Sequence, residues 1–408
     1  MRRFVRILAF FPMLFAASAV LLALWMRPDG ENGKTGNAPG TEAAVNEAAV
    51  NETVVDGAAV RETQAASVSA LPSLIPMEGY AYSRLTGEAR VLYREIYTSL
   101  MRFEKDSPVS TLDGEALRPV FDCVMADHPE IFWVDGYRYA SHMLGEEVRG
   151  ITFSGSFTQE PQEAKTRQEQ VEQAVRPFLD SLTPDLDDYE KLVKIYTYVV
   201  ENTRYDRNAS ENQNLCSVFL NGASVCQGYA AAFQYLCLRA GIPCVLVPGR
   251  VESGESHAWN LVQSSGSWYW ADPTWGDADY LPGEEGDALP ARPEVNYDYF
   301  MVSTQQLEKT HTPGAAFPLP ECTASADNYY VREGTLLNRA DMAAAAPLFE
   351  KAYARGDAVL TLKCTEKSVY EELERLLLEE QKLFTLLQDS DTAAYSLSPE
   401  QLTMTFWL

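Results

Sequence analysis

Residues 224–277 constrain the fold most, because they predict a helix and then strands without interruption. After Cys226, apolar residues recur at the spacing of a helix face: Tyr229, Ala230, Phe233, Cys237 and Leu238. Gly241 ends this run, and the apolar stretch 242–247 that follows is typical of a buried strand. Cys226 is therefore expected at the N-terminus of a helix that packs on a sheet.

A β-hairpin is predicted next. Residues 256–262 and 268–272 both read as strands, and Ser265–Gly266 lies between them as a turn. A turn centred on this pair places Asp272 opposite Trp259. The register matters because a slip of one residue would move every side chain to the other face of the hairpin.

This register brings two polar side chains together. Side chains alternate between the two faces of a strand, so one face carries His257, Trp259, Trp270 and Asp272. His257 and Asp272 are then diagonal neighbours, roughly 7–8 Å apart at their backbones and within side-chain reach. We expect the imidazole and the carboxylate to be in contact.

Cys226, His257 and Asp272 are together the candidate catalytic residues. A thiol attacks as its thiolate, which the positive end of a helix dipole favours at Cys226. His257 can accept the thiol proton, and Asp272 can fix the imidazole tautomer and stabilise the imidazolium. The backbone N–H of Cys226 is a candidate donor to an oxyanion, with Asn221 as a second candidate.

The motifs around these residues resemble a known family. GASVCQGYA, SHAWN and WYWADPTWGD are similar to the transglutaminase-like superfamily, in its bacterial exported branch. The resemblance implies an α+β, papain-like core, in which a helix bearing Cys226 packs on an antiparallel sheet bearing His257 and Asp272. It also implies the roles of nucleophile, base and orienting acid for these three. Animal transglutaminases have Trp after the nucleophile, whereas this chain has Gln227.

Composition changes along the chain predict five segments. Residues 1–27 read as a signal anchor, and 28–70, which lack aromatic residues, as a disordered linker. Residues 71–182 form an N-terminal helical and strand region, 183–320 the transglutaminase-like catalytic domain, and 321–408 a small α/β accessory domain.

The apolar run Ile7–Met26 predicts export. Its twenty residues are long enough to cross a bilayer of roughly 30 Å. Arginines precede the run, so the body is expected outside the cell membrane, held by a single N-terminal anchor. Ala17–Ala19 resembles a cleavage site, and cleavage would make the protein secreted.

Several local elements can be predicted as well. Helix start signals place Thr183 as the N-cap of a helix spanning 184–202. Tyr329–Val331 reads as a strand of the accessory domain, and the acidic, Gly- and Pro-rich stretch 278–294 as an exposed loop near the cleft.

The remaining ionisable residues receive smaller roles. Tyr205 and Asp206 are candidates for the cleft wall, and we interpret His128, His142 and His311 as structural because no partner for them is visible in the sequence.

The seven cysteines lie largely in apolar runs, which predicts small buried hydrophobes and at most one disulfide. A zinc site built from Cys216, Cys226, Cys237 and His257 is an alternative, but the chain lacks C-x-x-C spacing. We expect no metal ion and no cofactor, and no calcium-site pattern is visible.

The net charge of −25 argues against a nucleic-acid partner, since phosphate binding requires clustered Lys and Arg. The favoured function is a cell-envelope thiol peptidase or amidase that acts on protein or peptide amide bonds, including cell-wall peptides, through an acyl-thioester. Two alternatives stay open: a transglutaminase that crosslinks glutamine to amines, and a non-catalytic envelope scaffold with the same fold. The oligomeric state cannot be read from the sequence.

Overall fold

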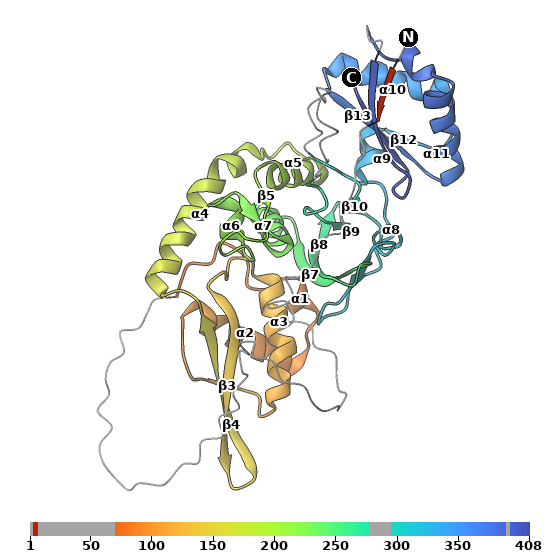
Figure 1. The fold of residues 1–408 in the computed structure, drawn as a ribbon. Coiled ribbons are helices and arrows are strands. Elements are labelled where there is room, and N and C mark those ends of the chain that lie inside the picture. Colours follow the sequence, from red (N-terminus) through yellow and green to blue (C-terminus); the bar gives the residue numbers. More distant parts are fainter. Residues whose placement is uncertain (1–2, 7–69, 278–294, 389–391) are drawn as a thin grey trace, which may run out of the picture.

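The computed structural model describes residues 3–6, 70–277, 295–388 and 392–408 (Figure 1). The fold mixes helices with sheets, and the sheet that follows the Cys226 helix is antiparallel, as the sequence predicts. One hydrophobic cluster runs from Leu71 to Cys322, and a second from Leu337 to Phe406. Figure 1 shows the second cluster's elements as a separate body beside the larger one. The domain boundaries at 182 and 320 stay predictions.

The N-terminal part of the larger body surrounds a three-stranded sheet of order β2-β4-β3. Its elements are α1 (Tyr80–Arg84), α2 (Gly87–Met101), β2 (Ser107–Val109), a 3-10 turn (Gly114–Ala116), α3 (Leu117–Asp127), β3 (Val134–Leu144), β4 (Glu147–Phe157) and α4 (Pro161–Ser181). In Figure 1 the β3–β4 hairpin extends away from the helices. Its tip carries the exposed side chains of Met143 and Leu144.

The middle of the chain builds a five-stranded antiparallel sheet of order β10-β9-β8-β7-β11. The elements here are α5 (Asp188–Glu201), β5 (Arg204–Tyr205), α6 (Leu215–Phe219), β6 (Ala223–Ser224), α7 (Cys226–Arg239), β7 (Cys244–Val251), β8 (Ser256–Ser264), β9 (Ser267–Ala271), β10 (Phe300–Val302), α8 (Thr304–Leu307) and β11 (His311–Pro313). Helix α7 packs on β7 and β8. The predicted helix that begins at Cys226 is confirmed.

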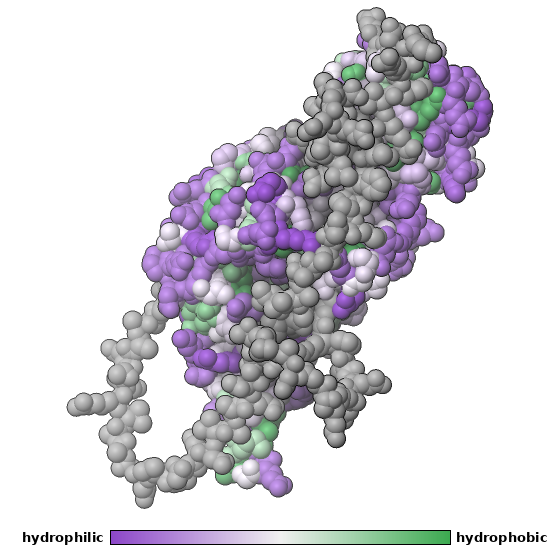
Figure 2. Space-filling model, in the orientation of Figure 1, coloured by the Kyte–Doolittle hydropathy of each residue, from purple (hydrophilic) through white to green (hydrophobic). Residues whose placement is uncertain are grey.

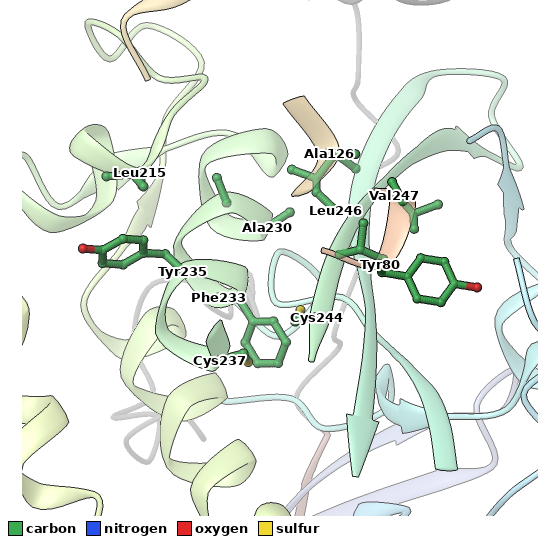
Figure 3. Close-up of a cluster of buried hydrophobic side chains, with 14 of the residues drawn as sticks. Tyr80, Ala126, Leu215, Ala230, Phe233, Tyr235, Cys237, Cys244, Leu246 and Val247 are labelled. Atoms are coloured by element: carbon green, nitrogen blue, oxygen red, sulfur yellow. The ribbon is translucent and has the colours of Figure 1, made fainter. Parts of the chain in front are cut away.

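The interface between α7 and the sheet forms the core that supports the site. Figure 3 shows Phe233 and Cys237 of α7 facing Cys244 of β7. All three side chains are buried, and α7 as a whole is buried on nearly every side. Two buried amides tie the helix down: Asn260 Nδ2 donates to the Ala230 carbonyl at 3.0 Å, and Gln234 Nε2 donates to a carbonyl of α3 at 2.7 Å. A helix held this firmly fixes the position of its first residue.

The hairpin register is confirmed. β8 and β9 pair Asn260 with Ala271 and Ser264 with Ser267, and this series continues to Trp259 opposite Asp272. The turn residues Ser265 and Gly266 have φ of 50° and 79°. Positive φ at both central residues gives the turn a backbone twist that matches the twist of the two strands it joins.

The predicted start of α5 is wrong. The helix begins at Asp188, and the N-cap is Asp187, not Thr183. The Asp187 side chain accepts from the Glu190 N–H, and the Glu190 side chain accepts from the Asp187 N–H, both at 2.8 Å. This reciprocal pair satisfies two helix-end donors, more than a single Thr hydroxyl can.

The smaller body is a sheet of order β1-β14-β15-β13-β12 with flanking helices. Its elements are α9 (Tyr329–Glu333), β12 (Leu336–Leu337), α10 (Met342–Arg355), β13 (Val359–Cys364), α11 (Lys367–Glu374), a π-turn (Arg375–Glu379), a 3-10 turn (Lys382–Thr385), β14 (Thr392–Ser398) and β15 (Thr403–Trp407). The predicted strand Tyr329–Val331 is wrong: it lies in α9. Asn328 caps this helix by accepting from the Tyr330 N–H, and Gly334 ends it at φ 74°.

Several predictions fall outside the described residues: the span Ile7–Met26, the linker 28–70 and the loop 278–294. Arg3–Arg6 forms strand β1, which pairs in parallel with β14. A chain that crossed a membrane between residues 7 and 26 could not also make this pairing. No helix within the described ranges is both long and apolar enough to span a bilayer.

Hydrophilic residues cover most of the described surface on the face seen in Figure 2. All seven cysteines are free and buried. Burial raises the pKa of several of these thiols, including that of Cys123 to about 12, which keeps them protonated and unreactive.

Candidate active site

Cys226 is the first residue of α7. The preceding residue, Val225, has extended backbone geometry and caps the helix without a side-chain hydrogen bond. The first N–H groups of a helix lack intrahelical acceptors and carry the positive end of its dipole. The Cys226 side chain is 6% exposed, so its thiol meets these donors in a nearly dry environment.

Gly228 explains why the helix can begin here. A Cβ at this position would lie 1.9 Å from Ser224 Oγ and 3.0 Å from Ser217 Oγ. These two hydroxyls bond each other at 2.6 Å and tie α6 to β6. The first turn of α7 therefore packs directly on them, and Gly228, two residues after Cys226, is a packing requirement.

His257 lies on β8, where it pairs with Gly249 of β7. Its Nε2 donates to Asp272 Oδ2 at 2.7 Å. A side-chain hydrogen bond joins the same imidazole to Cys226. The structure thus brings together all three residues that the sequence singles out.

Asp272 directly follows β9 and is fully buried. Its Oδ1 accepts from the backbone N–H groups of Thr274 at 2.9 Å and Trp275 at 3.3 Å. Its backbone carbonyl accepts from Tyr196 Oη at 2.9 Å, and its N–H donates to the Tyr299 carbonyl at 2.9 Å. Asp272 is therefore a turn residue as well as the partner of His257, and the turn fixes its carboxylate.

Burial and charge act against each other on this pair. Burial alone would lower the pKa of His257, but the Asp272 carboxylate, followed by the neighbouring Cys226, raises it to about 10. Burial alone would raise the pKa of Asp272, but charge and hydrogen bonds from His257 and His311 hold it well below its usual range. An imidazolium against a buried carboxylate is the resulting charge arrangement.

His311, interpreted from the sequence as structural, has a partner in the site. Its Nε2 lies 3.2 Å from Asp272 Oδ2, the oxygen that also binds His257, and its side chain is completely buried. The residue lies 39 positions after Asp272 and belongs to no recognisable motif. Only the pairing of β11 with β7, His311 opposite Val251, brings it to the site.

Aromatic rings surround the two histidines. The rings of Trp259 and Trp275 lie 5.8 and 6.1 Å from that of His257, centroid to centroid. They lie 4.9 and 4.5 Å from that of His311. These tryptophans keep water away from the charged pair, which strengthens the electrostatic interaction.

Tyr205, a candidate for the cleft wall, lies near the thiol. Burial, followed by the charge of Cys226, raises the pKa of Tyr205 to about 12. Asp206 pairs instead with Arg204, at 3.0 Å. Of the two oxyanion candidates, the N–H of Cys226 lies at the helix start, whereas Asn221 is exposed in the turn before β6.

The distances between the possible ligand atoms decide whether the site suits a metal ion. Within the described ranges, His257, Asp272 and His311 are the residues close enough to share an ion; the set with Cys216 and Cys237 is not brought together. Two ligand atoms on a tetrahedral zinc lie roughly 3.3 Å apart, whereas His257 Nε2 and Asp272 Oδ2 lie 2.7 Å apart. This distance fits a proton between the two atoms. We therefore interpret the cluster as hydrogen-bonded.

Comparison with known proteins finds similarity over the region that carries the site. Residues 177–273 match the model of the transglutaminase-like superfamily. The chain is 30% identical to kyphoscoliosis peptidase of Mus musculus over 123 residues, which are 25% of this chain and 19% of that protein. The human protein matches at 30% over 119 residues, 24% of this chain and 18% of that one. The chain thus spans under a fifth of the length of either relative.

Two solved structures show weaker likeness. A TGase gives a TM-score of 0.24 at 16% identity, over 37% of this chain and 49% of that chain. The periplasmic domain of TgpA from Pseudomonas aeruginosa gives 0.20 at 18% identity, over 32% of this chain and 55% of that one. Over residues 177–273, this chain is therefore similar to the core domain of the transglutaminase-like superfamily.

Proposed function

We propose that the chain is a thiol enzyme that acts on peptide or amide bonds through Cys226, His257 and Asp272. The observation that carries the proposal is the continuous contact from Cys226 to His257 to Asp272 in a buried setting, with the thiol at a helix start. The kyphoscoliosis peptidase relatives support a peptidase-type activity.

The reaction would begin from a Cys226 thiolate whose proton is already held by the imidazolium of His257. Nε2 of His257 is engaged by Asp272, which leaves Nδ1 to hold that proton. The thiolate then attacks the carbonyl carbon and forms a C–S bond, and the oxyanion is stabilised by N–H groups at the start of α7. Collapse breaks the C–N bond, and the imidazolium returns its proton to the leaving amine.

An acyl-thioester on Cys226 is the resulting intermediate. Water would attack it to release an acid, with His257 accepting one water proton and returning it to the sulfur. An amine would attack instead in a transglutaminase. We favour hydrolysis, because no feature of the sequence marks a site for a second, amine substrate.

We place this activity in the cell envelope. The apolar run Ile7–Met26 behind N-terminal arginines supports export, either anchored or cleaved. The substrates would be proteins or peptides of that compartment, including cell-wall peptides. The strongly acidic composition supports a site for peptides over one for nucleic acids.

Intact-protein mass spectrometry after mixing with a glutamine-containing peptide tests the proposal. A transient acyl adduct on Cys226 should form in the wild type and be absent in Cys226→Ala. Adding a primary amine separates the two enzyme classes: free acid as product indicates hydrolysis, and amine adduct indicates transamidation. Absence of an adduct, together with absence of any turnover that depends on Cys226, would support the scaffold alternative.

A further inference from the structure

Asp272 Oδ2 has two histidine partners of different character. His257 on β8 lies 2.7 Å away and His311 on β11 3.2 Å away. β8 and β11 flank β7 on opposite sides, so the two rings reach the carboxylate from different strands. The proposed mechanism uses only His257, which leaves His311 without a function.

The proton on His311 can be assigned from its partners. A carboxylate only accepts hydrogen bonds, so Nε2 of His311 must carry the hydrogen that faces Asp272. Burial lowers the pKa of His311, which makes the ring neutral at pH 7. Nδ1 is then an acceptor, and Thr310 Oγ1 lies 2.8 Å from it. The other acceptor within reach of the Thr310 hydroxyl, the Leu307 carbonyl, is farther away at 3.5 Å, so the hydroxyl donates to His311.

The same chain of hydrogen bonds continues away from the site. Thr310 Oγ1 lies 2.9 Å from Tyr299 Oη. Because the Thr310 hydrogen points to His311, the Tyr299 hydroxyl donates to Thr310. Tyr299 Oη in turn accepts from Gln401 Nε2 at 2.7 Å, and this last bond is buried. The hydroxyls of Thr310 and Tyr299 thus each donate one hydrogen bond and accept one. The donor and acceptor of every hydrogen bond from Gln401 to Asp272 are therefore fixed.

Gln401 belongs to the smaller body, in the turn between β14 and β15. Lys363 Nζ of β13 donates to the Gln401 carbonyl at 2.9 Å and to Asp298 Oδ1 at 3.2 Å. Thr403 Oγ1 donates to Asp298 Oδ2 at 3.1 Å. A buried ion pair therefore holds the Gln401 backbone against the residue that precedes Tyr299.

We propose that His311 is a positioning residue that holds the Asp272 carboxylate, and that Thr310 and Tyr299 of the larger body, together with Gln401 of the smaller body, fix its tautomer. The inference rests on the proposed function. A neutral N–H on Oδ2 keeps Asp272 ionised and oriented without competing with the charge of His257. The smaller body, through Gln401, thus contributes to the reactivity of Cys226.

Substitutions at His311 separate this role from a packing role. His311→Gln keeps an N–H donor near the place of Nε2, whereas His311→Leu removes it. The readouts, in the full chain, are the pH dependence of Cys226 alkylation by iodoacetamide and the titration of His257 by NMR. His311→Leu should slow alkylation at pH 7 by about tenfold or more, the effect of losing one hydrogen bond to a charged group. It should also lower the pKa of His257, and His311→Gln should restore much of both.

Variants of the residues that follow His311 in this series of hydrogen bonds extend the test. Tyr299→Phe removes one hydroxyl and keeps the ring, and it should shift both readouts in the same direction by a smaller factor, as should Gln401→Leu. Thr405→Val is the matched control, because it removes a hydrogen bond to Thr361, at 3.0 Å, within the smaller body and away from this network, and it should change neither readout.

The inference is overturned if folded His311→Leu keeps the wild-type alkylation profile and His257 titration, or if His311→Gln restores nothing. Should His311→Leu fail to fold, Tyr299→Phe decides the matter, and a wild-type result there contradicts the proposal. Failure of the proposed function would look different: wild-type Cys226 would not react faster than a cysteine in the unfolded chain, while the His257 titration would still report on His311.

Discussion

His257 Nε2 and Asp272 Oδ2 lie 2.7 Å apart, although the two residues belong to opposite sides of a hairpin and are fifteen positions apart in the chain. The contact depends on the turn at Ser265–Gly266, since a slip of one residue would direct Asp272 to the other face. The hydrogen bond between the imidazole and the carboxylate therefore depends on the geometry of this turn.

Asp272→Asn should lower the Cys226-dependent turnover by roughly 10⁴-fold, as the loss of an orienting carboxylate does in serine proteases. An amide nitrogen facing His257 Nε2 would force the hydrogen of the neutral ring onto Nδ1, which could then no longer accept the thiol proton. Steady-state kinetics measure the effect. Asp180→Asn, which changes an exposed carboxylate on α4, is the control and should leave turnover unchanged. Equal turnover in both variants would contradict the assigned role.

His257 should remain protonated up to a pKa of about 10. The pKa in the unfolded chain is about 6.5, so the stabilisation from the protonated ring is complete below pH ~6.5 and is lost as the pH rises through about 10. The lowered pKa of Asp272 acts in the opposite direction: its contribution is present above pH ~3.8 and is lost in acid.

NMR of ¹³C-labelled histidine measures the titration, and urea unfolding at pH 7 and pH 10 measures the stability. Asp272→Asn is the comparison, because it removes the main cause of the raised pKa and should flatten the loss of stability above pH 7. A wild-type His257 that titrates near pH 6.5 would be inconsistent with the buried ion pair.

The part of the site that could be predicted is the part where reactive residues lie within a clear helix or hairpin pattern. The helix start at Cys226 follows from apolar periodicity, and the contact of His257 with Asp272 follows from strand alternation and the turn. Both depend on residues that are close in sequence. His311 could not be predicted, because its position depends on the pairing of β11 with β7.

The two wrong elements have a similar explanation. Thr183 and Pro184 have favourable helix-start chemistry, but the capping box at Asp187 and Glu190 provides two hydrogen bonds where Thr183 would provide one. Tyr329–Val331 has strand-like composition, yet Asn328 and Gly334 cap it as a short helix. In both places the capping residues determined the structure more strongly than the residues between them.

Gly249→Ala should destabilise the fold and slow Cys226 alkylation. A Cβ there would lie 2.2 Å from the Trp259 ring and 2.4 Å from the Thr312 carbonyl oxygen, so β11 and His311 would have to shift. Overpacking of this kind costs typically ~1–3 kcal/mol of unfolding free energy. Gly136→Ala, whose Cβ would meet nothing closer than 3.9 Å, is the matched control. Urea unfolding of both variants checks this, and equal stability would contradict the close packing at Gly249.

Protease treatment of intact cells should release a fragment that begins within residues 28–70, if the span Ile7–Met26 anchors an outward-facing body. In that arrangement residues 3–6 lie across the membrane from β14. Recovery of the whole chain from the soluble cytoplasm would contradict the anchor and would agree with the pairing of β1 with β14.

Alkylation by iodoacetamide at neutral pH, with peptide mass spectrometry to locate the label, tests the central claim most directly. Cys226 is in contact with His257 at a helix start, whereas burial holds the pKa of Cys237 well above its usual value. Cys226→Ala should therefore abolish rapid labelling, and Cys237→Ala should leave it intact. Undiminished rapid labelling of folded Cys226→Ala, or a wild-type Cys226 that reacts only after unfolding, would contradict the account.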